Sequence, residues 1–488
     1  MNKEDVRVFN TLTGKKEAFL PLEPPLVKMY ACGPTTYNFI HLGNARPLVV
    51  FDTVRRYLEY LGYEVVYVQN FTDVDDKIMQ RAQEEEMSPL ELAEKYIAEY
   101  FVDAAALNVR RATVHPRVSE NMEEIIAFVN GLVQKGYAYE VAGDVFFEVS
   151  KFKEYGKLSK RTLDDLWAGA RIDVDERKKH PGDFALWKQA KPGEISWTSP
   201  WGEGRPGWHI ECSTMSTKYL GPSFDIHAGG LDLIFPHHEN EIAQSEALHD
   251  APMAKYWLHN GFITINQEKM SKSRGNFFLL REILQKYSPQ VVRFYLLSTH
   301  YRSPLDFAEE KLAAAEKGLE RLQTAYRLLQ ETQGEKEGRE QVAPEVWSKF
   351  SEDLAVFEQR FQEAMNDDFN TALALAVLFD LARALNSLHT DLLGKTVNSQ
   401  GKLLLEKAEK KYGELAGILG LELAKTDFTN DSATDSQLVN GLLKILIQVR
   451  QAARNNKDYV TADLIRDELK KLGIVLEDTP QGVRWKYS

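Results

Sequence analysis

The sequence predicts an α/β protein: a doubly wound parallel sheet with an insertion, then an α-helical bundle and a small C-terminal α+β module. Two short apolar runs, Leu26–Cys32 and Val65–Val68, flank a helical pattern that ends at Gly62. After Ser303 apolar residues recur at helical spacing over long stretches. The 488 residues are 43% hydrophobic and 27% charged, which is ordinary globular composition and enough for about three domains.

The first run and its neighbours form a strand, a helix and a strand. Leu26–Cys32 is typical of a buried strand that enters a loop at Gly33, and the helical pattern extends from Val50 to Leu61 before Val65–Val68. Such a βαβ unit is the building block of a Rossmann-like parallel sheet. Ligands of these sheets bind at the carboxyl ends of the strands. We therefore expect functional residues after Cys32 and after Gln69.

An insertion at about 119–205 interrupts this sheet. Ser119 is expected to cap a helix whose apolar face begins at Met122, and Tyr137–Val149 alternates like a hairpin. Strand character returns at Phe224–His227 and at Phe262–Ile265. A helix is expected between these two strands, after Pro236.

The second half of the chain is predicted to be helical. Ala308–Gln333 and Val346–Leu385 are long helical patterns, and Lys425–Ser436, rich in Thr, Asp, Asn and Ser, is typical of a linker. Gln437–Ser488 has nine basic against six acidic residues, so this segment carries +3 and the remainder −15 of a net charge of −12. An acidic chain gives no general basic footprint for nucleic acid, but its last segment does carry a local positive charge.

Two cysteines exclude a disulfide-rich secreted scaffold. The polar start lacks the apolar core of a signal peptide, and we find no run of 18 apolar residues that would span a membrane. These features predict a reduced, cytoplasmic protein with no membrane partner.

The loop after the first strand carries His41-Leu42-Gly43-Asn44. A histidine and an amide at a helix N-terminus, beside a glycine that lets a ligand approach, suit a polyphosphate that gains negative charge. A simple helix-capping turn is the alternative, because a match of four residues is weak.

A second motif, Lys269-Met270-Ser271-Lys272-Ser273, offers ammonium and hydroxyl donors to phosphate oxygens. A solvated basic loop would account for these lysines but not for the partner motif upstream. Together and in this order, HLGN and KMSKS resemble the two signatures of class I aminoacyl-tRNA synthetases. The resemblance implies that His41, Asn44, Lys269 and Lys272 are catalytic, and that ATP is bound by Gly43, His41, Asn44 and Lys272.

Cys32, Cys212, His237 and Glu241 form a candidate metal-binding set. With Pro236 at the first helical position, the i, i+4 spacing puts the histidine and the glutamate on one helix face. Two thiolates, an imidazole and a carboxylate can hold zinc tetrahedrally.

Each of these residues has an alternative. A lone cysteine is usually a small core residue, and no CxxC pair supports the zinc site. By spacing alone, His238 competes with His237, and Glu239 competes with Glu241.

The stretches Tyr30–Arg46, Asn70–Lys77, Gly204–Ser213, Phe224–Ser245 and Lys269–Phe278 resemble cysteinyl-tRNA synthetases of the bacterial type. The resemblance extends from Phe9 to Trp485 and implies one zinc ion held by Cys32, Cys212, His237 and Glu241. It also implies a cysteine pocket lined by Thr72, Trp208, His227 and Asp232. Asn44 replaces the second histidine of the generic HIGH signature and keeps a polar donor there.

The implied activity is that of a cysteine–tRNA ligase, a monomer that forms cysteinyl-adenylate from L-cysteine and ATP with Mg²⁺. The cysteinyl group is then transferred to the 3′-terminal adenosine of tRNA(Cys). Cysteine and serine differ by one atom, which an apolar pocket separates by only about 10–200-fold. Zinc binds the soft thiolate in preference to a hydroxyl, so it would supply the missing selectivity.

The resemblance implies five regions. These are a Rossmann-like catalytic domain at 1–302 with the insertion, a stem-contact region at 303–345, a helical bundle at 346–424, a linker at 425–436 and an anticodon-binding module at 437–488. In that module Tyr459, Trp485 and Tyr487 could stack on bases, and the basic residues could bind phosphate or base edges: Arg450, Arg454, Arg484 and Lys486. The alternative is that these aromatic residues belong to the core and that the charged ones are simply solvated.

Two other functions remain open from the sequence. A cysteine ligase of mycothiol synthesis, which joins cysteine to an amino-sugar, would share the metal set but lack a full anticodon module. A catalytically inactive RNA- or zinc-binding paralogue would keep the fold, although intact HLGN and KMSKS motifs count against it.

Overall fold

A four-stranded parallel sheet organises the first part of the protein. The computed structural model describes residues 5–161, 176–265, 268–269, 277–334, 340–424, 433–479 and 482–487. The strand order is β11 (Ala254–Asn260), β10 (Phe224–Gly230), β3 (Leu26–Ala31) and β4 (Glu64–Gln69), and every neighbouring pair is parallel. The predicted α/β fold class is confirmed.

Helices cover both faces of this sheet. α1 (Leu42–Tyr60) connects β3 to β4 and contacts β4, β10 and β11, whereas α6 (Ile210–Leu220) contacts β3 and β4. From β3 the chain builds β4 on one side and later β10 on the other, so the strand order reverses there. Such a reversal opens a crevice at the carboxyl ends of the strands.

Two helices and a small sheet border this crevice. α2 (Asp76–Glu84) and α3 (Pro89–Ala106) follow β4 and contact each other. β12 (Ile263–Ile265) pairs with β13 (Glu268–Lys269) and β14 (Leu305–Phe307), and the short helix α8 (Leu280–Leu284) begins beside His41. A hairpin of β1 (Arg7–Asn10) and β2 (Lys15–Ala18) lies against β11.

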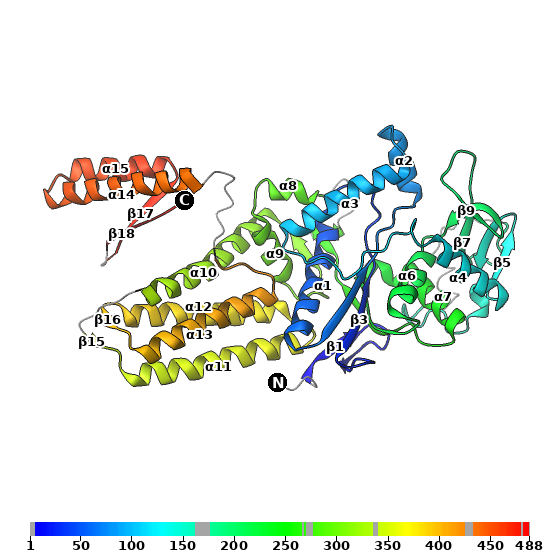
Figure 1. Ribbon diagram of the computed structural model, residues 1–488, viewed down its shortest axis with the longest axis horizontal. Coiled ribbons are helices and arrows are strands. Elements are labelled where there is room, and N and C mark those ends of the chain that lie inside the picture. Colours follow the sequence, from blue (N-terminus) through cyan, green and yellow to red (C-terminus); the bar gives the residue numbers. More distant parts are fainter. Residues whose placement is uncertain are drawn as a thin grey trace. The chain divides into compact units, whose positions relative to one another are not determined.

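The predicted insertion forms its own layer beyond α6, on the right of Figure 1. It combines α4 (Met122–Gln134) with an antiparallel sheet in the order β5 (Ala138–Val141), β6 (Asp144–Phe147), β7 (Phe184–Gln189), β9 (Gly202–Pro206) and β8 (Trp197–Ser199). The expected hairpin is β5–β6. The expected Ser119 cap is wrong, because α4 begins after Asn121 without a side-chain cap and Ser119 instead bonds to Asp73.

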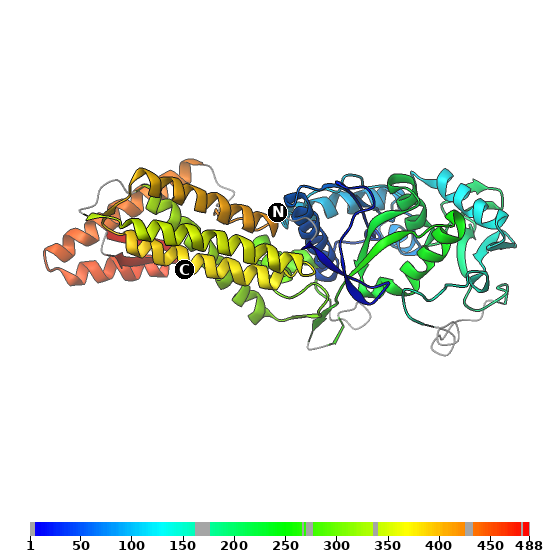
Figure 2. The ribbon, with the colours of Figure 1, turned by 90° about the horizontal axis from the view of Figure 1, so that it is seen from below.

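Four long helices run alongside one another in both ribbon views (Figures 1 and 2): α10 (Glu309–Gly334), α11 (Pro344–Asn366), α12 (Thr371–Leu392) and α13 (Ser399–Ile418). The single helical pattern expected over Val346–Leu385 is two helices. Asp368 and Phe369 have φ values of 63° and 51°, which end α11 and turn the chain into α12. By length and apolar composition α12 could cross a membrane, but half of its most apolar window is buried within the protein.

Buried polar contacts join the bundle to the sheet domain. Arg293 on α9 (Pro289–Leu297) donates to Asp52 on α1 at 2.6 Å and to the Leu419 carbonyl after α13 at 2.7 Å. Arg293 is fully buried, so losing either partner would leave a buried charge unpaired. This contact fixes the far half of the helix that begins at His41.

Residues 425–488 form a second compact unit, of which 433–479 and 482–487 are described. α14 (Ala433–Asn455) and α15 (Tyr459–Lys471) pack on each other, followed by the antiparallel hairpin β17 (Ile474–Thr479) and β18 (Gly482–Tyr487). Leu443, Leu469 and Ile474 form its small core.

Candidate functional site

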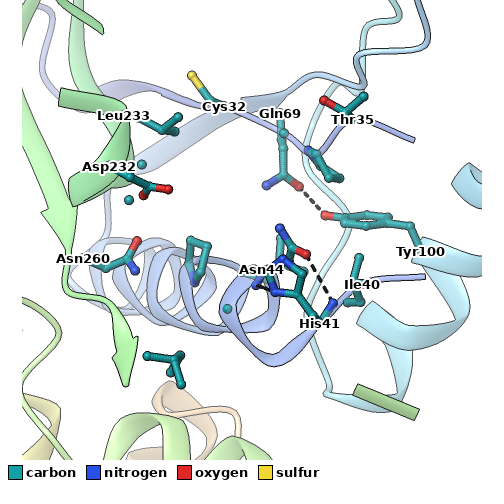
Figure 3. Close-up of a pocket in the computed structure, with 18 of the residues that line it drawn as sticks. Cys32, Thr35, Ile40, His41, Asn44, Gln69, Tyr100, Asp232, Leu233 and Asn260 are labelled. Atoms are coloured by element: carbon teal, nitrogen blue, oxygen red, sulfur yellow. Dashed lines mark hydrogen bonds between the residues drawn. The ribbon is translucent and has the colours of Figure 1, made fainter. Parts of the chain in front are cut away.

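A cavity of about 390 Å³ opens at the carboxyl ends of the parallel strands. Its wall comes from the loop after β3, the start of α1, the end of β4, the segment after β10 and the end of β11 (Figure 3). The lining includes Cys32, His41, Gly43, Asn44, Gln69, Lys77, Tyr100, Trp208, Asp232 and Asn260. The expectation that functional residues follow Cys32 and Gln69 matches this location.

Cys32, Cys212, His237 and Glu241 come together at one end of this cavity. Their ligand atoms all lie within 4.8 Å of one another, and the last three residues are buried. Cys32 follows β3, Cys212 is on α6, and His237 precedes α7 (Glu239–His249). Nε2 of His237 is 3.0 Å from Oε1 of Glu241.

Local backbone geometry differs from the regular helix start that was expected here. Ile234–His238 forms one wide π-type turn, in which Phe235 has extended φ and ψ angles, and Pro236 follows a cis peptide bond. The regular helix therefore begins only at Glu239. His237 and Glu241 still face each other, because the wide turn leads directly into α7.

Cys32 and Glu241 belong to a second possible ligand set, with His227 and His238. His238 Nε2 lies 3.4 Å from the Cys32 sulfur, and His227 Nε2 lies 2.8 Å from Glu241 Oε2. The competitor Glu239 is excluded from both sets, because its carboxylate accepts from the backbone of Gly156 and Ser159.

The charges of the first set depend strongly on one another. A hydrogen bond from Cys32 lowers the pKa of the Cys212 thiol to about 6 against the effect of burial, whereas burial raises the pKa of Cys32. Burial opposes charge on His237, but Glu241 raises the pKa of that imidazole to about 10. The cluster therefore favours a thiolate and a carboxylate with protons between them, and a metal ion would displace those protons.

Further histidines support the cluster from behind. Nδ1 of His238 lies 2.8 Å from Nε2 of His259, and Nδ1 of His259 lies 2.7 Å from the Thr11 hydroxyl. Burial holds the pKa of His238 well below the usual range and lowers that of His259 to about 3. This chain of neutral rings fixes the orientation of His238 beside Cys32.

Of the four residues assigned to the cysteine pocket, Trp208 and Asp232 line the cavity, whereas Thr72 and His227 are buried and are not part of its lining. Thr72 is buried and donates to Glu211 at 3.0 Å. The indole of Trp208 is 45% exposed and lies 4.5 Å from the His237 ring. His227 is buried against Trp257, and Asp232 lines the cavity.

The HLGN segment begins α1 at the other end of the cavity. Nδ1 of His41 accepts the backbone N–H of Asn44 at 3.2 Å, and Oδ1 of Asn44 accepts the backbone N–H of His41 at 3.2 Å. The HLGN segment therefore does form the helix-capping turn that the sequence left as an alternative to a phosphate site. Because Nδ1 accepts, the neutral ring carries its proton on Nε2, and Nδ2 of Asn44 stays outside the cap.

Of the KMSKS segment, the structure describes only the backbone of Lys269, which belongs to β13 beside β12. Lys272 lies outside the described residues. β12 follows Asn260 and Gly261, which line the cavity, and Lys269 is the register partner of Thr264 on that strand.

The side chains singled out in the last segment differ in exposure. Tyr459 is 60% exposed at the start of α15, whereas Arg450 is buried on α14 with only 4% exposure. Trp485 packs against the small core of the second unit. Arg450 is therefore buried and Trp485 partly buried. The side chain of Tyr487 lies outside the described part.

Sequence reasoning missed several polar groups of the site. Glu211 accepts from Thr72, and Gln69, Tyr100 and Asn260 line the cavity. Gln69 and Asn260 are the last residues of β4 and β11. Their position at strand ends was the signal that could have identified them.

Comparisons with known proteins find families and relatives that match the sequence along most of its length. The family described as the catalytic domain of class I (C) tRNA synthetases matches residues 18–317, the DALR domain matches 360–424, and the cysteinyl-tRNA ligase anticodon-binding domain matches 444–485. The cysteine–tRNA ligase of Heliobacterium modesticaldum is 61% identical over 485 residues, 99% of each chain. That of Desulforamulus reducens is 60% identical over 487 residues, again 99% of each.

Solved structures share the fold at low sequence identity. Methionyl-tRNA synthetase of Mycobacterium tuberculosis, in complex with methionyl-adenylate, has a TM-score of 0.58 at 14% identity and covers 81% of this chain and 90% of its own. A leucyl-tRNA synthetase of Agrobacterium radiobacter also has a TM-score of 0.58, at 12% identity, covering 83% and 86%. Together with the full-length relatives, these findings show that the chain belongs to the cysteine–tRNA ligase family of class I aminoacyl-tRNA synthetases.

Proposed function

We propose that this cysteine–tRNA ligase selects its amino acid through a zinc ion held by Cys32, Cys212, His237 and Glu241. The observation that carries the proposal is the convergence of four ligand atoms within 4.8 Å at the end of the cavity. Their donor chemistry suits zinc, since two thiols, an imidazole and a carboxylate are its preferred ligands. When bound, zinc supplies a soft Lewis acid that prefers the thiolate of cysteine to the hydroxyl of serine.

The two-thiol set is favoured over the set with His227 and His238. Cys212 already has a lowered pKa of about 6, and a metal ligand has to be deprotonated. Nδ1 of His227 is buried and has no hydrogen-bond partner among the described residues, and both nitrogens of His238 already face neighbouring groups. These two histidines thus suit a supporting role, in which they hold Glu241 and Cys32 in place.

Thr72, Trp208, His227 and Asp232 would enclose the substrate beside this metal site. In the first step an oxygen of the cysteine carboxylate attacks the α-phosphorus of ATP. A new O–P bond forms, and the bond to the bridging oxygen of pyrophosphate breaks with its electron pair. Pyrophosphate leaves, together with its Mg²⁺.

At the start of α1, the Nε2–H of His41 and the Nδ2–H of Asn44 would donate to the phosphate oxygens, with Gly43 allowing close approach. The N-terminus of α1 adds the positive end of its dipole. Lys269 and Lys272 would hold the β- and γ-phosphates, as ammonium groups do elsewhere. Because little covalent chemistry falls to the protein, catalysis is mainly positioning and charge stabilisation.

In the second step a ribose hydroxyl of the 3′-terminal adenosine of tRNA(Cys) attacks the adenylate carbonyl, and AMP leaves. We assign residues 303–345 to stem contact, 346–424 to the helical bundle, 425–436 to the linker and 437–488 to anticodon binding. Support comes from the anticodon-binding match at 444–485. We further propose that the enzyme works as a monomer in the cytoplasm.

The decisive experiment is ATP–pyrophosphate exchange with cysteine and with serine, together with a measurement of bound zinc. We expect exchange with cysteine, one zinc per chain and at least about 10³-fold less exchange with serine, because packing alone would give only about 10–200-fold. Equal exchange with both amino acids, or full activity of a zinc-free preparation, would rule out selection by the metal.

An amino-sugar ligase would lose little activity if the C-terminal module were removed, whereas a tRNA ligase would charge tRNA less efficiently. A chain that ends at Ala424 keeps the first compact unit whole. We expect it to retain cysteine-dependent exchange but to charge tRNA at least about 10-fold less efficiently. The reason is that stacking between anticodon bases and aromatic side chains, about 1–3 kcal/mol per base, is lost. Undiminished charging would remove the anticodon role of residues 437–488. An inactive paralogue would show no exchange at all.

A further inference from the structure

The structure assigns a role in the activation step to Gln69, whose amide nitrogen points into the cavity between the metal cluster and the start of α1. We infer that this nitrogen donates to the anionic oxygens where the cysteine carboxylate meets the α-phosphate, and that Tyr100 is a positioning residue that orients the amide. This inference rests on the proposed function, in which Gln69 has no assigned role.

Strand geometry places Gln69 at the junction of the two substrates. Gln69 ends β4 and is the register partner of Ala31, the residue before Cys32. Side chains alternate between the two faces of a strand. Asn70 therefore lies on the face of the metal cluster, where it contacts the Cys212 sulfur, and Gln69 lies on the opposite face, toward α1 and α3.

Tyr100, on α3, determines which way the amide is turned. Its hydroxyl donates to Oε1 of Gln69 at 2.5 Å, and no other partner of that hydroxyl is found among the described residues. The phenol is buried, and burial raises its pKa well above the usual range, so its proton stays on. Because a buried hydroxyl proton needs an acceptor, Oε1 has to face Tyr100 and Nε2 has to face away.

The backbone of Gln69 is fixed as well. Its carbonyl accepts from Nδ1 of His115 at 2.9 Å, and its amide N–H donates to the Val114 carbonyl at 3.1 Å. Within the described part of the chain, Nε2 is the one polar atom of Gln69 that has no hydrogen-bond partner. In Figure 3 Gln69 stands between Cys32 and the pair His41 and Asn44, with its oxygen toward Tyr100 and its nitrogen toward the open cavity.

An amide donor at this point serves the reaction in a specific way. Negative charge of the carboxylate and of the α-phosphate has to converge before the new O–P bond can form. A donor that is held in place by Tyr100 stabilises this charge without reorganisation, which is how preorganised donors lower a barrier. The thiol end of cysteine is bound elsewhere, so this contact contributes to kcat rather than to recognition of the amino acid.

The test compares Gln69→Leu, Gln69→Glu and Tyr100→Phe in the full-length, zinc-loaded enzyme, with cysteine-dependent pyrophosphate exchange as the assay. We expect Gln69→Leu to lower kcat about 10²-fold and to change KM for cysteine by less than about threefold. Gln69→Glu should be lower still, because a carboxylate repels the reacting anions. Tyr100→Phe should cost about 10-fold, because the freed amide can turn its oxygen toward the cavity.

Tyr96→Phe is the matched control, because Tyr96 lies on the same helix and donates to Glu85 outside the cavity. It should leave the exchange kinetics unchanged. Adding Tyr100→Phe to Gln69→Leu should cost nothing more, since Tyr100 acts only through Gln69. Zinc content and the thermal midpoint of each variant serve as readouts that a loss of structure would move.

Different results separate the possible failures. If the wild-type enzyme shows no exchange with cysteine, the proposed function itself is wrong. If wild-type enzyme is active and Gln69→Leu keeps kcat within about twofold, the role of Gln69 is wrong. Additive losses in the double variant would show that Tyr100 does not act through Gln69. A Gln69→Leu variant that fails to fold leaves Tyr100→Phe and Gln69→Glu to decide in the same way.

Discussion

The two ends of the cavity are built in different ways. At the metal end, Cys32, Cys212 and Glu241 come from three separate elements and meet in the buried interior. At the other end, His41 and Asn44 cap the first turn of one helix through contacts three residues apart. In the proposed function, recognition of the thiol would therefore depend on long-range assembly, whereas recognition of the phosphates would depend on a local turn. Substitutions at the two ends should consequently fail in different ways.

The largest effect is expected at the metal end. Cys212→Ser should abolish zinc binding and lower cysteine-dependent exchange by about 10³-fold, because a hydroxyl is a poor zinc ligand. Exchange kinetics and metal analysis would test this. Met215→Leu, at an equally buried position on the same helix, should keep both. A Cys212→Ser enzyme with full zinc content would contradict the ligand assignment.

A smaller effect is expected at the helix start. His41→Ala should lower kcat about 10²-fold through the lost phosphate donor and the free energy of unfolding by about 1 kcal/mol through the lost cap. Asn398→Ala removes a comparable cap from α13, far from the cavity. It should cost the same stability and leave kcat unchanged. Equal kinetic losses in both variants would mean that His41 acts only as a cap.

A pH effect is expected at His115, which supports the strand end between the two ends of the cavity. Burial lowers the pKa of His115 to about 4, while both ring nitrogens are used, Nδ1 by the Gln69 carbonyl and Nε2 by the backbone N–H of Ala112. The unfolded chain, with a histidine pKa of about 6.5, takes up the proton first as the pH falls. The contribution of the neutral His115 ring to the free energy of unfolding is therefore complete above pH 6.5 and is lost on acidification toward pH 4.

At pH 5 the free energy of unfolding should be about 2 kcal/mol lower through His115 alone. Urea unfolding at pH 7.5 and at pH 5 would measure it. His115→Gln should be less stable than wild type at pH 7.5 but should show a smaller change between the two pH values. An unaltered pH dependence in the variant would assign the acid sensitivity to other groups.

The smallest effect is expected from Thr72→Val in the cysteine pocket. It removes the donor to the buried Glu211, at a cost of about 1–2 kcal/mol. KM for cysteine should rise about 10-fold with little change in zinc content. The control Thr53→Val removes a buried hydroxyl that donates to the Val49 carbonyl and accepts from Arg293, outside the cavity lining, and it should leave KM unchanged. Equal KM values in the two variants would place Thr72 outside the cysteine pocket.

The strands β3, β4 and β10 and the edge of the sheet that carries the site were predictable from the sequence. The fourth parallel strand, β11, was not expected, and the strand expected at Phe262–Ile265 is β12 of the smaller sheet. Apolar runs such as Leu26–Cys32 are local signals, and the rule that ligands bind at the carboxyl ends of strands follows from topology alone. The break at Asp368 and Phe369 was not predictable, because the apolar periodicity continues across it. The predicted Ser119 cap was wrong for a similar reason, since its hydroxyl donates to Asp73, which is distant in the sequence.

By itself, the sequence determined the fold class, the family resemblance and which residue types could bind a metal or phosphate. Only the tertiary structure brought Cys32 and Cys212 to the same point, and it also placed His227 and His238 close enough to form a second possible ligand set. It likewise turned the Gln69 amide toward the cavity through Tyr100. The physical reason is range: periodicity and spacing encode contacts within one element, whereas a site at a sheet edge is made by side chains that meet only after the strands have paired.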